Sequence, residues 1–189
     1  AAGTVSQVVG VPSGIHPDYA PFYIRRVRVS RADPICTLLI DSGVPYHPEV
    51  GTNLENATTY VFEWPTKSNS LRVRNNCSAL EQLKYYKLFK KYWCDNRGNP
   101  SCTIYVKDHE WVEVGAWVYK HFDEVCGVSF LPFDNGTYRQ APFTEISKEE
   151  YEAFKAKFPG TINWDEFVEI DDQTGGAQEL ACTGGVCTL

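Results

Sequence analysis

The feature that most constrains the fold is an alternation of helix and strand patterns in the middle of the chain. A helix pattern at about 79–93 precedes the short apolar run Cys102–Val106. A second helix pattern, WVEVGAWVYKHF, then leads to another strand-like run at Gly127–Phe133. The connection between the two runs is long enough to cross over, as parallel strands require. This succession predicts an α/β architecture.

Two predicted helices begin with a capping box, in which a serine and a glutamate three residues later exchange hydrogen bonds with the backbone. Ser78 with Glu81 opens the helix at about 79–93, and Ser147 with Glu150 opens a helix over KEEYEAFKAKF. Helical spacing of apolar residues in the first helix predicts one buried face, made of Leu80, Leu83, Tyr86, Phe89 and Trp93. The WVEVGAWVYKHF helix has a similar face of Trp111, Val114, Val118 and Phe122.

The first third of the chain holds one short helix pattern and two strand patterns. Residues 3–10, GTVSQVVG, predict a turn that opens a short helix. The stretch Tyr23–Val29 alternates apolar and basic residues, which predicts a strand with one wet or ligand-facing side. Residues Ala57–Pro65 are rich in β-branched and aromatic types, so we expect a strand that Pro65 ends.

Composition bounds the class of protein. The 189 residues are 43 % hydrophobic and 14 % aromatic, enough for one buried core. A net charge of −6 argues against a nucleic-acid-binding surface, and no apolar run approaches the roughly 20 residues that span a bilayer. The opening AAGTVSQVVG lacks the basic and apolar regions of a secretory signal, so we expect a soluble, cytoplasmic chain with no membrane or nucleic-acid partner.

Seven cysteines, an odd number scattered along the chain, are a poor disulfide framework and indicate a reducing compartment. We expect the five internal ones to be small buried hydrophobic residues; they are Cys36, Cys77, Cys94, Cys102 and Cys126. No C-x-x-C pair or His/Cys cluster has the spacing of zinc ligands. The sequence therefore predicts no metal site.

The remaining cysteines, Cys182 and Cys187, lie on a glycine-rich tail and are separated by four residues. Disulfide exchange needs an accessible thiolate and a second thiol that resolves the mixed disulfide. A flexible tail offers both, so a redox function is one interpretation of this pair. Inert exposed thiols and a weak metal clip are the alternatives.

The turn GTVSQ is a candidate anion site. It offers backbone N–H groups from Gly3 to Ser6 at a helix N-terminus, where unsatisfied donors and the helix dipole attract an anion such as phosphate. Simple capping of the helix is the alternative.

The histidines and strand arginines favour structural roles. His16 and His47 each precede a proline, which predicts extended or turn backbone and structural hydrogen bonding. We expect His109 and His121, in polar helical surroundings, to face solvent. The arginines of IRRVRV are expected to pair with acidic residues, with steering of phosphates as the alternative.

Five segments resemble, in the same order, the C-terminal part of the class II, adenosylcobalamin-dependent ribonucleotide reductases. They are GTVSQVVGVPSGIHPDYAPFYIRRVRVS, GVPYHPEVG, NPSCTIYVKDHEWVEVGAWVY, GVSFLPFDNGTYRQAPFTEIS and GAQELACTGGVC. The resemblance runs from residue 3 to the end of the chain, and the length of the blocks makes it specific for class II.

The resemblance implies roles for six residues. It makes a loop that holds the substrate phosphates on backbone amides and hydroxyls from Gly3, Thr4, Val5 and Ser6. It makes Cys182 and Cys187 the tail pair that re-reduces the active-site disulfide after each turnover and is recharged by a thioredoxin-type partner. The implied reaction converts ribonucleotides to 2′-deoxyribonucleotides through a thiyl radical that adenosylcobalamin generates.

The resemblance also implies the last strands of a ten-stranded α/β barrel over residues 1–170, followed by a redox-active tail over residues 171–189. The family's radical cysteine and the two cysteines oxidised by substrate reduction lie upstream of the phosphate loop, and nothing in these residues matches them. We therefore expect a split subunit or fragment that works on a larger N-terminal reductase polypeptide. The alternative is a non-catalytic module for thiol–disulfide exchange or metal binding.

Overall fold

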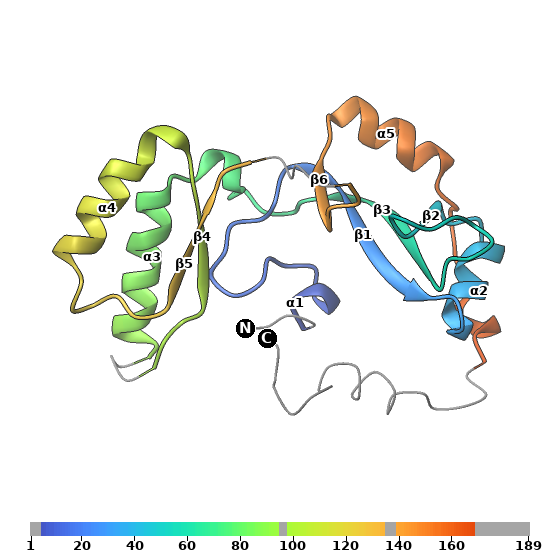
Figure 1. The fold of residues 1–189 in the computed structure, drawn as a ribbon, viewed down its shortest axis with the longest axis horizontal. Helices are drawn as coiled ribbons and strands as arrows, with labels where there is room; N and C mark the ends of the chain where they lie inside the picture. Colours follow the sequence, from blue (N-terminus) through green and yellow to red (C-terminus); the bar gives the residue numbers. More distant parts are fainter. Residues whose placement is uncertain (1–4, 95–97, 135–138, 169–189) are drawn as a thin grey trace. The chain divides into compact units, whose positions relative to one another are not determined.

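The computed structural model describes residues 5–94, 98–134 and 139–168 (Figure 1). The described residues form two compact units. The first unit contains residues 5–27 and the described part of 63–157, and the second contains residues 28–62 and 158–168.

The first unit contains most of the regular elements. Its helices are α1 (Val5–Val8), α3 (Ala79–Tyr92), α4 (Trp111–Lys120) and α5 (Lys148–Lys157), with 3₁₀ turns η1 (Arg74–Asn76) and η2 (Asp108–Glu110). Its strands are β4 (Cys102–Val106), β5 (Val128–Pro132), β6 (Phe143–Glu145), the start of β1 (Phe22–Ser30) and the end of β3 (Thr59–Lys67).

The strand-helix-strand succession is confirmed. Strands β4 and β5 pair in parallel, with Cys102 opposite Val128 and Val106 opposite Pro132, and α4 lies in the connection between them. Helices α3 and α4 lie on the same side of this pair (Figure 1). The core between helices and strands is made of Ala79, Leu83, Tyr86, Cys102, Ile104, Val106 and Val114. Because side chains alternate along a strand, Thr103 and Tyr105 point to the opposite face.

Both capping boxes are also confirmed. The Ser78 hydroxyl accepts from the Glu81 amide at 3.2 Å, and the Glu81 carboxylate accepts from the Ser78 amide at 2.8 Å. The same exchange joins Ser147 and Glu150 at 2.7 and 3.1 Å, where α5 begins. These contacts satisfy backbone donors that a helix start leaves open, so local sequence alone fixes both starts.

The remaining strands pair antiparallel. In the first unit, β6 pairs with β1, with Tyr23 opposite Glu145. In the second unit, β2 (Tyr46–Pro48) pairs with β3, with Tyr46 opposite Phe62, and the unit also holds α2 (Pro34–Asp41) and η3 (Trp164–Glu166). The hydrogen-bonded strand order is β2-β3-β1-β6.

Three expectations about particular residues are wrong. Strand β3 continues through Pro65 to Lys67, and this is tolerated because its pairing with β2 ends at Phe62. Trp93 and Phe122 are 83 % and 72 % exposed because each lies just beyond the last residue of its helix, where the helical spacing no longer applies.

The ten-stranded barrel is not seen in the described residues, whose strands form one four-stranded and one two-stranded sheet. Across the same residues, none of the helices has the length and apolar character that crossing a bilayer would demand.

Candidate functional site

The predicted phosphate loop falls partly within α1. Gly3 and Thr4 lie outside the described residues, whereas Val5 and Ser6 are the first two residues of the helix. Val5 is exposed and Ser6 is buried. The helix stops after one turn, since Gly10 adopts a φ of +66°, a left-handed conformation that favours glycine. The described half of the loop is therefore a short, tightly turned segment.

A pocket of about 590 Å³ lies beside α1, and we call it the loop pocket. Its wall comes from the 7–19 segment, the start of β1, the 66–74 segment, and the face of β4 that carries Thr103 and Tyr105. The ionisable side chains at this wall, apart from His16 and the tyrosines, are Arg25, Lys67, Arg74 and Asp18. Three cations face one carboxylate in a chain whose net charge is −6, so the loop pocket suits an anionic ligand.

His16 holds the 7–19 segment against β4. The Thr103 amide donates to His16 Nε2 at 2.9 Å, so this nitrogen carries no proton. His16 Nδ1 therefore carries the proton and donates it to the Ser13 carbonyl at 2.7 Å. Both ring nitrogens are engaged with backbone, which confirms the structural role predicted for His16.

Asp18 ties the same segment to the chain before η1. Its carboxylate accepts from the Ser68 hydroxyl at 2.5 Å and from the Tyr19 amide at 2.8 Å. Its backbone accepts from the Arg74 amide at 2.8 Å and donates to the Arg72 carbonyl at 2.9 Å. The only carboxylate of the wall, within the described residues, is thus committed to holding the fold together.

Aromatic rings form much of the loop pocket's wall. Phe143 stacks on Tyr19 with ring centroids 5.3 Å apart and meets Tyr23 edge-on at 5.7 Å. Burial, followed by the Asp18 carboxylate, raises the pKa of Tyr23 to about 12. Burial also raises the pKa of Tyr19, and the positive charge of Arg74 partly offsets that rise. Both phenols therefore hold their protons at neutral pH.

The strand arginines behave largely as the sequence indicated. Arg26 pairs with Glu63 at 2.7 Å and donates to the Thr144 hydroxyl at 2.6 Å. Arg28 pairs with Glu49 at 3.2 Å. Arg25 differs, because it donates to the side-chain amide oxygen of Gln7 and lines the loop pocket.

The predicted redox cysteines, Cys182 and Cys187, lie outside the described residues. Among the internal cysteines, all free thiols, Cys36, Cys77 and Cys102 are buried as predicted, whereas Cys94 is half-buried. Cys126 is exposed, so that prediction is wrong for it. Burial raises the pKa of Cys102 to about 11, which keeps this core thiol protonated and unreactive.

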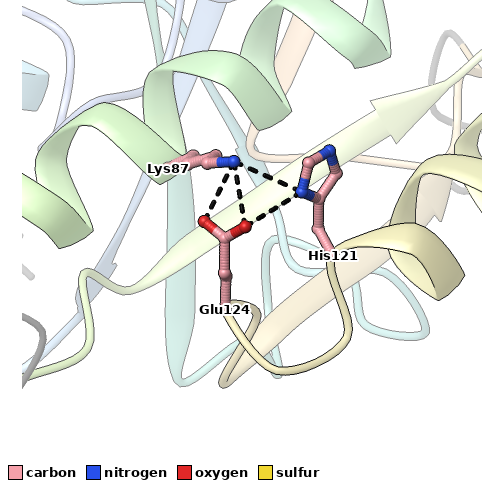
Figure 2. A network of polar contacts seen from close by, with 3 residues as sticks. All are labelled: Lys87, His121 and Glu124. Carbon is pink, nitrogen blue, oxygen red and sulfur yellow. Dashed lines mark hydrogen bonds and ion pairs between the residues drawn. The ribbon is translucent and has the colours of Figure 1, made fainter.

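A second polar cluster joins α3 to the turn after α4 (Figure 2). Lys87 Nζ lies 2.9 Å from a Glu124 carboxylate oxygen and 3.3 Å from His121 Nδ1. Lys87, and then His121, lower the pKa of the Glu124 carboxyl. His121 also lies 4.4 Å from the Trp117 ring and is half-buried, so its predicted solvent exposure is wrong, whereas His109 is exposed as predicted. These contacts are those of a surface ion pair that links two elements.

The sequence gave no signal for several residues of the loop pocket. Arg74, Tyr19 and Lys67 stand in no motif, and they meet only because residues 18 and 72–74 are bonded to each other across the fold. A buried arginine beside tyrosines is visible in a structure, but it has no local spacing that a sequence pattern could detect.

No family model matches the chain. Curated relatives nevertheless cover it. The adenosylcobalamin-dependent ribonucleoside-triphosphate reductase of Lactobacillus gasseri is 29 % identical over all of this chain and 25 % of its own length. The protein of the same name from Euglena gracilis is 28 % identical over 98 % of this chain and 25 % of its own. A probable reductase of this kind from Dictyostelium discoideum is 33 % identical over 79 % of this chain and 20 % of its own.

A solved structure points the same way. A crystal structure of a B-12 dependent, class II ribonucleotide reductase superposes with a TM-score of 0.70 at 27 % identity, covering 85 % of this chain and 22 % of that one. The chain matches the C-terminal region of the class II ribonucleotide reductase family. It spans about a quarter of the length of the class II reductases it matches. The resemblance stated from its sequence segments is therefore confirmed.

Proposed function

We propose that this chain works as part of a ribonucleotide reductase that converts ribonucleotides to 2′-deoxyribonucleotides by a thiyl-radical mechanism. The observation that carries the proposal is the agreement of relatives over the full chain with a superposable class II reductase structure. In this proposal residues 1–170 contribute strands to the ten-stranded barrel of the assembled enzyme, and residues 171–189 form its redox tail. The radical cysteine comes from a larger N-terminal reductase part. A cytoplasmic location stays a prediction.

The first role is to anchor the substrate phosphates. In the proposal, Gly3, Thr4, Val5 and Ser6 hold them on backbone amides and hydroxyls. The position of α1 beside a pocket with an excess of cations supports this role, because charge-assisted hydrogen bonds and nearby cations both favour phosphate. Anchoring fixes the ribose relative to the radical centre, which lowers the entropic part of the barrier.

The second role is re-reduction by the tail. A thiolate of the Cys182 and Cys187 pair attacks the active-site disulfide and forms a mixed disulfide, releasing one active-site thiolate. The second tail thiol then resolves the mixed disulfide, which restores the active-site dithiol and leaves the tail pair oxidised. A thioredoxin-type dithiol returns the two electrons to the tail. Two thiols and one disulfide exchange at each step, so electrons and protons balance.

The cofactor of the proposed enzyme is adenosylcobalamin, which supplies the radical when bound. The described residues do not fit it in any specific way, since they contain no group of three or more His, Cys, Asp or Glu side chains able to hold a metal ion. We therefore assign cobalamin binding to the assembled enzyme, and no step of this chain is derived through it.

The proposal is tested by purifying the tagged chain from its native source and assaying the eluate for deoxyribonucleotide formation with adenosylcobalamin and dithiothreitol. We expect cobalamin-dependent product. In that system, Ser6→Ala should raise KM severalfold with little change in kcat, because phosphate anchoring contributes binding in both ground and transition states. Ser101→Ala, at an exposed serine, is the matched control. A folded chain that never yields product, and whose thiols respond only to oxidants or metals, would support the thiol module instead.

A further inference from the structure

Arg74 is the least satisfied charged side chain among the described residues. It is only 3 % exposed, and a guanidinium stays charged at any ordinary pH. Its Nη1 donates to the Asp134 carbonyl at 3.1 Å, but Nε and Nη2 are buried with no hydrogen-bond partner among the described residues. Buried polar groups in folded proteins nearly always have partners, so the exceptions call for an explanation such as a bound ion.

The surroundings of Arg74 compensate its charge only in part. The guanidinium carbon lies 3.7 Å from the Tyr19 ring centroid and 4.9 Å from that of Phe133. Such cation–π contacts are favourable but weaker than a carboxylate partner. The Asp18 carboxylate, at the wall of the same loop pocket, is occupied by the Ser68 hydroxyl and the Tyr19 amide. Arg74 therefore keeps most of its positive charge uncompensated.

The loop pocket adds two further cations. Arg25 and Lys67 line it together with Arg74, and Arg25 donates to a neutral amide oxygen, not to a carboxylate. Three cations from β1, the end of β3 and η1 thus surround a volume of about 590 Å³, with one engaged carboxylate among them. A ligand with several adjacent negative charges matches this arrangement better than a single anion does.

We propose that Arg74, with Arg25 and Lys67, is an oligophosphate-binding residue of the loop pocket, neutralising the phosphates that lie beyond those held by the α1 loop. This inference rests on the proposed function for the identity of the phosphate-bearing molecule. Because Nε and Nη2 are covered, an anion reaches them only when a side chain moves, and we expect the stacked Tyr19 ring to be the one that moves. Arg74 is then held in an unsatisfied state that a ligand relieves.

The test measures binding of inorganic tripolyphosphate to the full chain by calorimetry and by thermal melting, with sodium chloride at matched ionic strength. Arg74→Met should weaken binding at least tenfold, because it removes charge-assisted hydrogen bonds. The ligand-free variant should melt at the same or a higher temperature than the wild type, since an unpaired buried charge is removed. Lys67→Gln, at an exposed residue, should weaken binding severalfold, whereas Lys120→Gln, an equal charge change on α4, should not.

Two results would overturn the inference. One is an Arg74→Met variant that melts lower and still binds tripolyphosphate as the wild type does, which assigns Arg74 to the fold alone. The other is an equal loss of affinity in Lys67→Gln and Lys120→Gln, which shows a general charge effect. Arg74-dependent tripolyphosphate binding without reductase activity would keep this inference and remove the proposed function. Reductase activity without Arg74-dependent binding would do the reverse.

Discussion

Replacing His16 tests whether the 7–19 segment depends on this side chain for its attachment to β4. His16→Ala removes the hydrogen bonds to Thr103 at 2.9 Å and Ser13 at 2.7 Å and leaves a half-buried Thr103 amide without its acceptor. A neutral hydrogen bond contributes about 1 kcal/mol and an unsatisfied buried donor costs about 1–3 kcal/mol. We expect the free energy of unfolding to fall by about 2–3 kcal/mol, which lowers the melting midpoint by roughly 4–12 °C.

The assay is urea and thermal unfolding of the full chain, followed by circular dichroism. His16→Gln places an acceptor near the position of Nε2 and should recover about half of the loss. His109→Ala, at an exposed histidine, is the matched control and should change stability by less than about 0.5 kcal/mol. A His16→Ala chain as stable as the control would refute the claim that this ring fixes the wall of the loop pocket.

Further predictions concern a buried cap and a buried phenol. Glu110 accepts from the Ala79 amide at 3.1 Å and the Lys107 amide at 2.9 Å, so Glu110→Ala should cost about 2–4 kcal/mol in denaturant unfolding and Glu110→Gln clearly less; equal losses would contradict this. The pKa of Tyr23 is raised from 10.0 to about 12, so its contribution to stability is complete below pH 10 and is lost as the pH rises through about 12. Spectrophotometric titration should show one late tyrosinate that Tyr23→Phe removes, and an unchanged titration would refute the assignment.

Features set by local chemistry were predicted from the sequence. The Ser78 and Ser147 capping boxes involve residues only three positions apart, so spacing alone identified both helix starts. The strand Cys102–Val106 was predicted with its exact bounds, because an apolar run between turn residues marks a buried strand. The parallel pairing of β4 and β5 then followed from the helix between them.

Features set by long-range packing were not predicted. Strands β2 and β6 have three residues each, too few for a periodic pattern. Pro65 lies inside β3 because the partner strand ends earlier, which a propensity for strand ends cannot indicate. Arg74 becomes a site residue only through its burial between Tyr19 and Phe133, distant positions in the sequence.

The most direct test of the proposed function compares two reductants in the cobalamin-dependent assay. The wild-type chain and Cys182→Ser are each assayed for deoxyribonucleotide formation with dithiothreitol and with a thioredoxin system. We predict that Cys182→Ser retains activity with dithiothreitol, which reduces the active site directly, and loses it with thioredoxin, which needs the tail pair. Undiminished activity of Cys182→Ser with thioredoxin would contradict the account.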